Sequence, residues 1–452
     1  MKEKQKITTM IKQTLRQALT MMKQHRLFTS IYIAGTALSV TMIMITFAVL
    51  YIKFAPLYPE ENRERTLHIR NITAITNHPE DGEQKNTHRC SPKLAELIKD
   101  ECKYLDNLSC YSTSNRMKLS ATADKSSKRI KEYAVYTDEQ FWKVHTYRFI
   151  DGHPFSEQDV KSNNRVVVIP LGTAMELFAT HKVAGKHIYV DGEEHTIVGV
   201  IKDAPSAVTR TYAIYMPFGL DKDKPWFDNT KKELAGMYKI IATAKKASEK
   251  ELLKKEIEEK IARYNAGSAT CKYEIADHIL THVESVYDHE IYGNDAYRNF
   301  IKEIVLIIAA FLLIPALCLS IMIFSRMENR MVEMGVRKAY GATTGSIIFQ
   351  VLSENMLLTL IGGILGFAIS ATLLFTASRW MLFLFDSGDV LSSSIWDMDN
   401  WGEQIVDFSM IFNPTLFAAT LIVCMFINIV SALLPVTAKM RHSIVYSLNR
   451  RK

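Results

Sequence analysis

The segment Leu27–Ile52, LFTSIYIAGTALSVTMIMITFAVLYI, decides the class of this protein because it contains no charged residue. A helix of this length covers roughly 39 Å, which is enough to cross a bilayer. A cleavable signal peptide is the alternative interpretation. The apolar stretch is too long for one, however, and no small-residue cleavage site follows it. We therefore expect an uncleaved membrane anchor.

Three further apolar segments follow after a long charged stretch. They are Ile304–Ser325, Met356–Ala377 and Pro414–Leu434. A globular domain spreads its apolar residues at helix or strand periods, whereas this chain gathers them in blocks of membrane-spanning length. The sequence therefore predicts four transmembrane α-helices and a large domain between the first two.

The net charge of +7 is placed at the ends of these blocks. Basic residues cluster at 1–26, 326–338 and 439–452, whereas the loop 378–411 holds six acidic residues and only Arg379 as a base. Cytoplasmic loops carry the excess of Lys and Arg, so both termini are expected inside the cell and the large domain outside. The clusters face lipid headgroups and lack interleaved stacking aromatics. We expect membrane lipids as partners and no nucleic acid.

This topology divides the chain into segments with defined positions. In order they are a cytoplasmic amphipathic helix (1–26), the first span (27–52), the extracytoplasmic domain (53–303), the second span (304–325), a cytoplasmic loop (326–355), the third span (356–377), an extracytoplasmic loop (378–411), the fourth span (412–435) and a cytoplasmic tail (436–452). The first helix lies on the inner membrane surface in one interpretation and packs against its own protein in the other.

The large domain shows helix and strand signals in alternation, which predicts an α+β fold in two lobes. Ser91-Pro92 is typical of a helix start, and Asp191-Gly192 is typical of a hairpin turn. The remaining predicted elements are strands at 130–137, 165–170, 186–190 and 195–201, a short helix at 172–178, and a β-α-β unit at 237–244, 246–264 and 271–276.

Motifs of catalysis are missing from the sequence. It contains no GxxxxGK[ST] phosphate loop, GxSxG elbow or HExxH zinc motif, so we expect no catalytic residue and no cofactor bound by this chain. His278 and His282 have metal-ligand spacing. Without a third ligand at fixed spacing we interpret them as solvated surface residues and expect no metal site. Pairing stays open for the four cysteines of the large domain: Cys90, Cys102, Cys110 and Cys271.

Small residues interrupt the third span at Gly362 and Gly366, and Ser370 continues the line. Such spacing lets two helix backbones approach closely in lipid, so it predicts a helix contact without naming the partner helix. The spans carry almost no charge. Because charged spans mark pathways for ions and polar solutes, the sequence favours a mechanical linkage over a conducting pore.

Residues 333–345, EMGVRKAYGATTG, resemble the cytoplasmic loop of the MacB/FtsX-type ABC transporter permeases. The large domain is similar to the MacB-like periplasmic core in the order and spacing of its segments. These segments are FWKVHTYRFIDGHPF (141–155), RVVVIPLGTAMELF (165–178), AGKHIYVDGEEHTIVGVIKD (184–203) and IYMPF (214–218). The tail departs from the family, since RHSIVYSLN (441–449) stands where members often have Asp-Pro-x-x-Ala-Leu.

This resemblance implies a permease subunit of the bacterial inner membrane that works with a separate cytoplasmic ABC ATPase, on which ATP and Mg²⁺ bind. It implies a homodimer, or a heterodimer with a second permease, and a periplasmic adaptor as a further partner. The large domain would have a porter-like lobe, from segments around 60–112 and 235–290, and an inserted lobe. The ATPase would contact a coupling helix formed by Glu333, Met334, Gly335, Arg337, Lys338 and Gly341.

The resemblance implies mechanotransmission, in which ATP hydrolysis moves the periplasmic domain and no substrate threads the membrane. Efflux is the expected outcome, as export or extraction of a peptide, drug or lipoprotein. The alternative is an FtsX-like regulatory membrane protein that activates an envelope hydrolase or a signalling partner.

Overall fold

The computed structural model describes most of the chain between residues 26 and 440. The described residues are 26–78, 82–100, 102–124, 126–205, 213–221, 233–268, 271–276, 278–287, 298–299, 301–310, 313, 336, 340–341, 343–376 and 414–440. They fall into two compact units. The helical unit takes in residues up to Tyr51 and most of those from Asn299 onward, and the β-rich unit takes in Ile52–Arg298.

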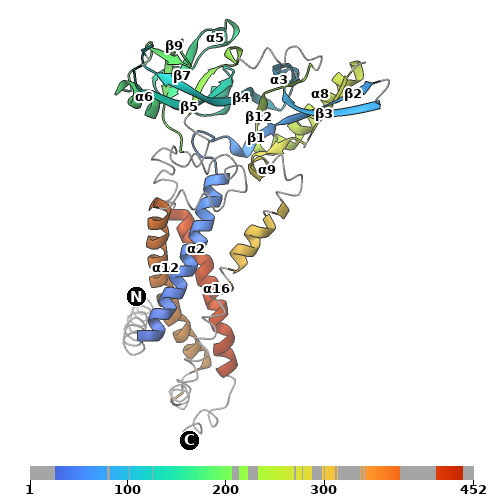
Figure 1. The fold of residues 1–452 in the computed structure, drawn as a ribbon. Helices are drawn as coiled ribbons and strands as arrows, with labels where there is room; N and C mark the ends of the chain where they lie inside the picture. Colours follow the sequence, from blue (N-terminus) through green and yellow to red (C-terminus); the bar gives the residue numbers. More distant parts are fainter. Residues whose placement is uncertain are drawn as a thin grey trace, which may run out of the picture. The chain divides into compact units, whose positions relative to one another are not determined.

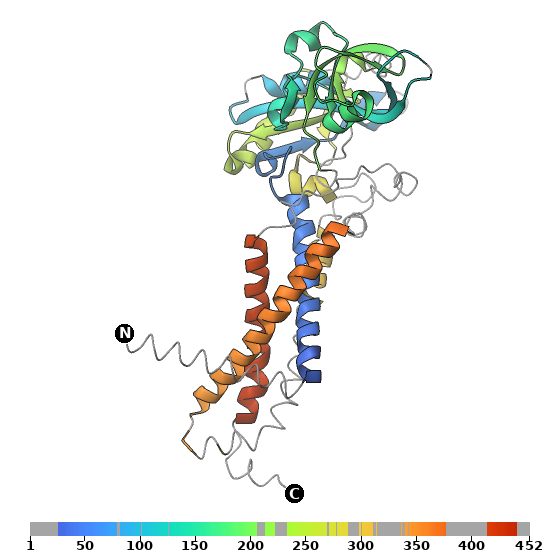
Figure 2. The same cartoon turned by 90° about the vertical axis from the view of Figure 1, so that its left-hand side faces the viewer.

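Three long helices make up most of the described helical unit: α2 (Arg26–Phe54), α12 (Thr344–Thr376) and α16 (Pro414–Met440). Figures 1 and 2 show them side by side. A small apolar cluster joins all three, formed by Val40, Ile43, Met44 and Cys424 with Phe47, Phe367 and Phe417 against it. α12 begins at Thr344, twelve residues before the predicted third span, so the end of the predicted cytoplasmic loop is helical.

Two helices among the described residues are long and apolar enough to cross a membrane, namely Thr29–Phe54 and Asn355–Thr376. α16 contains a shorter apolar stretch, Phe417–Ile427. Of the predicted second span, the structure describes 304–310 and residue 313, all helical. The rest of that span, the predicted loop 378–411, residues 1–25 and residues 441–452 lie outside the described residues.

A ten-stranded sheet forms the larger part of the β-rich unit. Its order is β14-β1-β12-β4-β5-β10-β7-β9-β6, and β8 pairs with both β4 and β9. The strands are β1 (Thr66–Ile69), β4 (Leu105–Ser120), β5 (Arg129–Thr137), β6 (Phe149–Gly152), β7 (Val166–Pro170), β8 (His187–Val190), β9 (Glu193–Ile201), β10 (Ala213–Pro217), β12 (Lys239–Ala244) and β14 (Leu280–Thr281).

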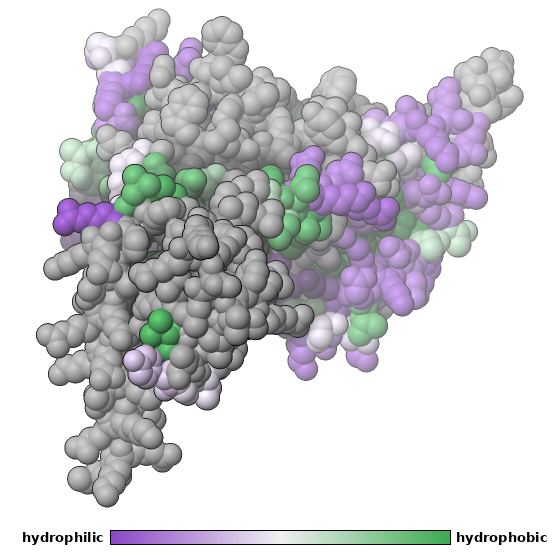
Figure 3. Space-filling model, turned by 90° about the horizontal axis from the view of Figure 1, so that it is seen from below, coloured by the Kyte–Doolittle hydropathy of each residue, from purple (hydrophilic) through white to green (hydrophobic). Residues whose placement is uncertain are grey.

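A four-stranded antiparallel sheet is the second sheet of this unit, with the strand order β11-β3-β2-β13. Its strands are β2 (Asn71–His78), β3 (Gly82–Cys90), β11 (Ala235–Gly236) and β13 (Cys271–Ile275). Helix α8 (Lys250–Gly267) lies beside them in Figure 1. It buries Leu253, Ile257 and Ile261 at helical spacing and turns its charged residues outward. Figure 3 shows hydrophilic residues gathered on this side.

Short helices complete the β-rich unit. They are α3 (Pro92–Lys99), α4 (Phe141–Val144), α5 (Glu157–Lys161), α6 (Leu171–Phe178), α9 (His282–Tyr287) and the 3₁₀ turns η1 (Arg63–Arg65), η2 (Phe218–Leu220) and η3 (Ala247–Glu249). The predicted start of α3 is confirmed, because the Leu94 N–H donates to Ser91 Oγ and proline occupies the first turn.

Three apolar clusters lie among the described residues of this unit, and long strand β4 contributes buried residues to two of them. The first is built from residues between 67 and 110 and between 234 and 279, and includes Leu108 and Cys110 of β4. The second is built from residues between 117 and 216, and includes Met117 and Leu119 of β4. The third is built from residues between 135 and 215. The first cluster therefore combines segments that precede and follow the segment that forms the other two.

Most predicted strands of the large domain are confirmed within two residues of their predicted ends. The β-α-β unit is wrong, because β12 pairs antiparallel with β1 and β4 in the ten-stranded sheet. β13 pairs with β2 in the other sheet. The residues of β12 and β13 do not reveal which distant strands they pair with, so the sequence did not separate the two sheets.

Candidate functional site

The predicted ATPase-contacting residues lie almost entirely outside the described part of the chain. Of the six, the structure describes only Gly341. Its φ of 91° is left-handed, and just before it the Tyr340 N–H donates to Val336 O at 3.1 Å. Glycine adopts this conformation without steric cost and commonly ends helices. The roles of the other five residues stay a prediction: Glu333, Met334, Gly335, Arg337 and Lys338.

Gly362 and Gly366 face α2. A Cβ at Gly366 would lie 2.6 Å from Ala37 O and 2.9 Å from Val40 Cβ, and a Cβ at Gly362 would collide with Thr36 Oγ1. Glycine is therefore what allows α12 to approach α2 this closely. The sequence predicted a close contact at these positions, and the structure supplies the partner helix that the sequence left open.

Hydroxyl groups reinforce the same helix contact. Thr41 Oγ1 donates to Ala37 O within α2 and also lies 3.1 Å from Gly366 O of α12. The Tyr32 hydroxyl lies 3.2 Å from Thr359 Oγ1. Both bonds join buried groups on different helices, so the packing of the helical unit combines small residues with a few polar contacts.

Arg63 holds the end of α2 inside the β-rich unit. It stands at the start of η1 with only 4% of its surface exposed. Its Nη1 donates to Ile52 O at 2.8 Å and to Ala55 O at 2.9 Å, while its Nε donates to Glu60 Oε2 at 2.9 Å. The last carbonyls of a helix have no partner within the helix and carry partial negative charge. A guanidinium at this place supplies both hydrogen-bond donors and positive charge.

His282, the first residue of α9, holds a third carbonyl of the same turn. Its Nε2 lies 3.1 Å from Lys53 O and must carry the proton that it donates. The side chain is buried, with 8% of the residue exposed, which corrects the expectation of a solvated surface residue. His278 is exposed, has φ of 64° and precedes the helix. The two do not share a helix face, and the described residues hold no group of three metal-ligating side chains.

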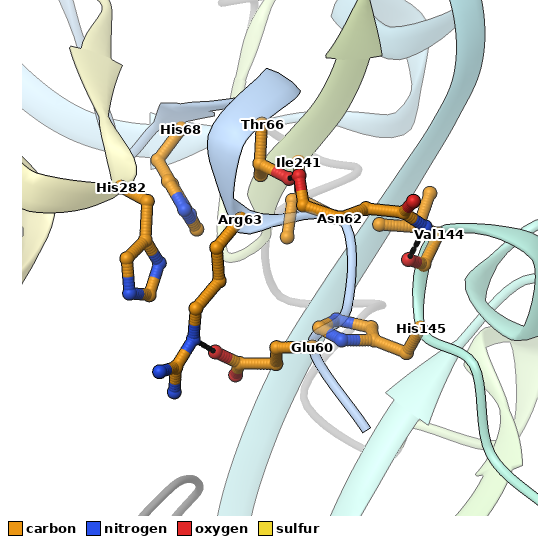
Figure 4. A pocket seen from close by; sticks show the side chains of 9 residues that line it. All are labelled: Glu60, Asn62, Arg63, Thr66, His68, Val144, His145, Ile241 and His282. Atoms are coloured by element: carbon orange, nitrogen blue, oxygen red, sulfur yellow. Dashed lines mark hydrogen bonds and ion pairs between the residues drawn. The ribbon is translucent and has the colours of Figure 1, made fainter. Parts of the chain in front are cut away.

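Two more histidines face this helix end from other elements. His68 comes from β1, and its ring lies 5.9 Å from that of His282. His145 follows α4 and its ring lies 4.4 Å from that of Phe141. His68 Nε2 is buried and has no hydrogen-bond partner among the described residues. Figure 4 shows these rings around the Glu60–Arg63 pair. We call Glu60, Arg63, His68, His145 and His282 the α2-end cluster.

Burial and like charge disfavour added protons on these histidines. Burial lowers the pKa of His68 well below the usual 6.5, and the neighbouring cations reinforce the shift. Burial lowers the pKa of His145 and His282 as well. The negative charge of Glu60 raises the pKa of both histidines, and the positive charge of Arg63 lowers it. Burial works against ionisation of Glu60, but Arg63, His145 and His282 together outweigh it and lower the pKa of that carboxyl. The cluster at neutral pH is thus one ion pair with three neutral imidazoles.

A small pocket lies at the centre of the cluster, with room for about one water molecule. It is lined by Glu60, Asn62, Arg63, Thr66, His68, Val144, His145, Ile241 and His282. The site is too small for an organic substrate and contains no activated nucleophile. What the arrangement can do is fasten the end of α2 to η1 and α9, beside residues of β1 and β12 and residues that follow α4.

The cysteines of the β-rich unit are unpaired. Cys90, Cys110 and Cys271 are buried in one apolar core, and Cys102 is partly exposed beside it. Burial raises the pKa of Cys90 to about 12 and that of Cys110 well above its usual value. The thiols of Cys90 and Cys110 thus stay protonated at neutral pH, and the three buried cysteines pack as small apolar groups.

The family of this chain is shown by its match to two descriptions. MacB-like periplasmic core domain covers residues 29–260, and FtsX-like permease C-terminal covers residues 305–444. The first alone spans half of the chain. The protein therefore belongs to the MacB/FtsX-type ABC transporter permeases, which confirms the family indicated by the sequence.

Similar proteins carry related names. The uncharacterized ABC transporter permease YknZ of Bacillus subtilis is 24% identical over 237 residues, which is 51% of this chain and 54% of YknZ. The macrolide export ATP-binding/permease protein MacB of Neisseria gonorrhoeae is 27% identical over 242 residues, 52% of this chain and 34% of MacB. The matched part thus spans about half of YknZ and a third of MacB.

Solved structures of related domains are similar at low identity. The periplasmic region of MacB from Actinobacillus actinomycetemcomitans is 15% identical with a TM-score of 0.32, covering 46% of this chain and 89% of that region. The extracellular domain of YknZ from Gram-positive bacteria is 14% identical with a TM-score of 0.30, covering 45% and 99%.

Proposed function

We propose that this chain is the permease subunit of an ABC transporter that transmits ATP hydrolysis by a separate cytoplasmic ATPase to its periplasmic domain. The observation that carries the proposal is the succession of the two family matches, 29–260 and 305–444, along one chain. The sequence has no phosphate loop, so ATP and Mg²⁺ are assigned to the partner. The cargo is a peptide, drug or lipoprotein that is exported or extracted.

The proposed topology has four spans with both termini in the cytoplasm of a bacterium and the β-rich unit outside. The two apolar helices and the placement of basic residues support it. Cysteines introduced at 333–341 test it by labelling of intact cells with an impermeant maleimide. These positions should stay unlabelled until the membrane is opened, whereas a cysteine at exposed Lys182 should label at once. Labelling of 333–341 from outside would end the proposal.

The coupling helix is proposed to present Glu333 and Arg337 to the ATPase. The test is ATP hydrolysis by the copurified complex in lipid nanodiscs. Glu333→Ala and Arg337→Ala should each remove most of the stimulated activity while membrane insertion is unchanged. Arg326→Ala and Glu328→Ala, earlier in the same predicted loop, are the matched controls. Equal activity in all four variants would reduce the loop to a membrane anchor.

A regulatory role is the second candidate, favoured by the FtsX-like match over residues 305–444. In that case ATP hydrolysis would activate an envelope hydrolase or a signalling partner through the β-rich unit, with no cargo. Copurification from native membranes followed by mass spectrometry separates the two. A periplasmic adaptor among the partners supports export, and a hydrolase supports regulation.

A further inference from the structure

At the end of α2, carbonyls of the first apolar helix are held by ionisable side chains of the β-rich unit. Arg63 and His282 together take the carbonyls of Ile52, Lys53 and Ala55. α2 is a single helix from Arg26 to Phe54, so a displacement along its length reaches this turn directly. The turn passes the displacement on through the groups bonded to it and through the chain that leads from it into η1.

We propose that the α2-end cluster is a proton-sensitive latch that couples α2 to the β-rich unit, closed when its histidines are neutral and loosened when they are protonated. This inference rests on the proposed coupling function and assigns a regulation to it. Arg63 and His282 act as positioning residues that grip the helix end, and His68 is the group that senses the proton.

His68 is chosen as the sensor because of what surrounds it. Its Nε2 is buried without a partner among the described residues, so a proton added there finds no acceptor. Four charged or titratable groups face His68. They are His282 on α9, His145 after α4, Lys239 on β12, and Arg70, two residues after His68 in the chain. Each of them is a cation or becomes one when it is protonated. A charge on His68 is therefore disfavoured by the cations Arg70 and Lys239, and it repels the ring of His282, 5.9 Å away, once that ring is protonated as well.

The other groups do not relieve this repulsion. His282 faces Glu60, Arg63 and Lys250, and His145 faces Glu60, Arg63 and His282. Glu60 is the acid that faces both, and it is already paired with Arg63 at 2.9 Å. A protonated His282 would still donate to Lys53 O. The weak point is thus His68, where an added proton is buried without an acceptor and repels His282 once that ring is also protonated, so that α9 is pushed away from the helix end.

The direction of the pH effect follows from the lowered pKa of these histidines. An imidazole whose pKa is lower in the closed latch takes up its proton more readily in the open one. The closed form is then fully favoured above the usual pKa of 6.5 and loses ground as the pH falls below it. Uptake of one proton changes the closed-to-open ratio by about tenfold per pH unit within that window.

Hydrogen exchange of the full chain in lipid nanodiscs tests the latch without the ATPase. Between pH 7.5 and 5.5, and after correction for intrinsic rates, protection of the amides at 52–66 should fall about tenfold. His68→Phe, which cannot bind a proton at this position, should make the fall clearly smaller and leave only the part that His145 and His282 contribute. His195→Gln, at another buried histidine, is the control and should behave as the wild type. If His68→Phe and the wild type share one pH profile, the latch is wrong.

A second measurement guards against a variant that fails to fold. In the wild-type chain labelled with [¹³C]histidine, the resonance lost in His68→Leu is assigned to His68. That resonance should titrate well below 6.5, and titration at or above 6.5 would overturn the assignment of His68 as the sensor. In the complex, ATPase activity that is absent at every pH would refute the proposed function. A normal activity with no pH-dependent difference between wild type and His68→Phe would refute only the latch.

Discussion

The same helix, α2, is held in two different ways in the two units. In the helical unit it packs on α12 through Gly362 and Gly366, with backbone near backbone and little charge. In the β-rich unit its last turn is held by Arg63 and His282, with an ion pair and buried imidazoles. Lipid offers no hydrophobic drive between helices, so small residues create the contact there. Around the helix end, unsatisfied carbonyls call for donors and positive charge.

The two attachments of α2, to α12 and to the α2-end cluster, should respond differently to pH. A contact made of glycine and methyl groups has no group that titrates, so pH leaves it unchanged. The α2-end cluster has four titratable side chains around Arg63, and its strength follows the proton concentration. One helix thus has a fixed attachment and an adjustable one.

Removal of Arg63 should have the largest effect. Arg63→Ala leaves Glu60 without its ion-pair partner and two carbonyls of the helix end without donors. Breaking a buried ion pair from one side costs about 3–5 kcal/mol. Exchange protection of the β1 amides in the full chain should fall accordingly, and Arg63→Lys should recover part of it. A loss below about 1 kcal/mol, as for a surface pair, would show that the cluster does not fasten the helix.

The glycine contact should be broken by Gly366→Leu, at a lower cost. The backbone carbonyl of Ala37, 2.6 Å from the position of the new Cβ, cannot move aside without shifting α2. Overpacking of this kind costs about 1–3 kcal/mol, read as exchange protection of α2 at 33–44. Gly35→Ala is the matched control, because a Cβ there meets nothing within 4 Å. If both substitutions behave alike, the glycine line is not a packing device.

The dependence of stability on pH should arise in the β-rich unit. Glu132, which lies in that unit, should lower stability as the pH rises. Burial, helped by Glu176 and Asp203, raises the pKa of Glu132 from 4.5 to about 8. The folded chain holds a proton that the unfolded chain has released, so stability declines as pH rises from 4.5 to 8. Glu132→Gln should flatten this decline in the melting temperature. Glu132 is still partly exposed, so the change should be smaller than for Gly366→Leu. An unchanged profile would contradict the raised pKa.

The sequence predicted one attachment of α2 and missed the other for a physical reason. Gly362 and Gly366 are four residues apart, so one helix turn brings them together and local spacing reveals them. The α2-end cluster joins residues far apart in the chain; His282 and Lys53 are separated by 229 positions. No spacing rule links such residues before β1, α4 and α9 are assembled. A cue existed in Glu60 and Arg63, an acid and a base three positions apart after an apolar helix.

Fold prediction followed the same division. Strands such as β5 and β7 are apparent from composition, because aromatic and β-branched residues favour them locally. The sheet to which β12 or β13 belongs depends on partners distant in the chain, and there the prediction was wrong. The early start of α12 at Thr344 was missed because its first turns carry polar residues that apolar segmentation excludes.

Removal of a polar contact between the helices should cause the smallest loss of stability, which can be compared directly with the loss in Arg63→Ala. Thr41 Oγ1 bonds to Ala37 O in its own helix and lies 3.1 Å from Gly366 O, whereas Thr46 Oγ1 donates only to Met42 O. The difference between Thr41→Val and Thr46→Val therefore isolates the bond between helices. In membranes such bonds average about 0.6 kcal/mol, measured here as exchange protection of α2. A difference as large as that of Arg63→Ala would mean that hydrogen bonds, and not small residues, hold the helical unit together.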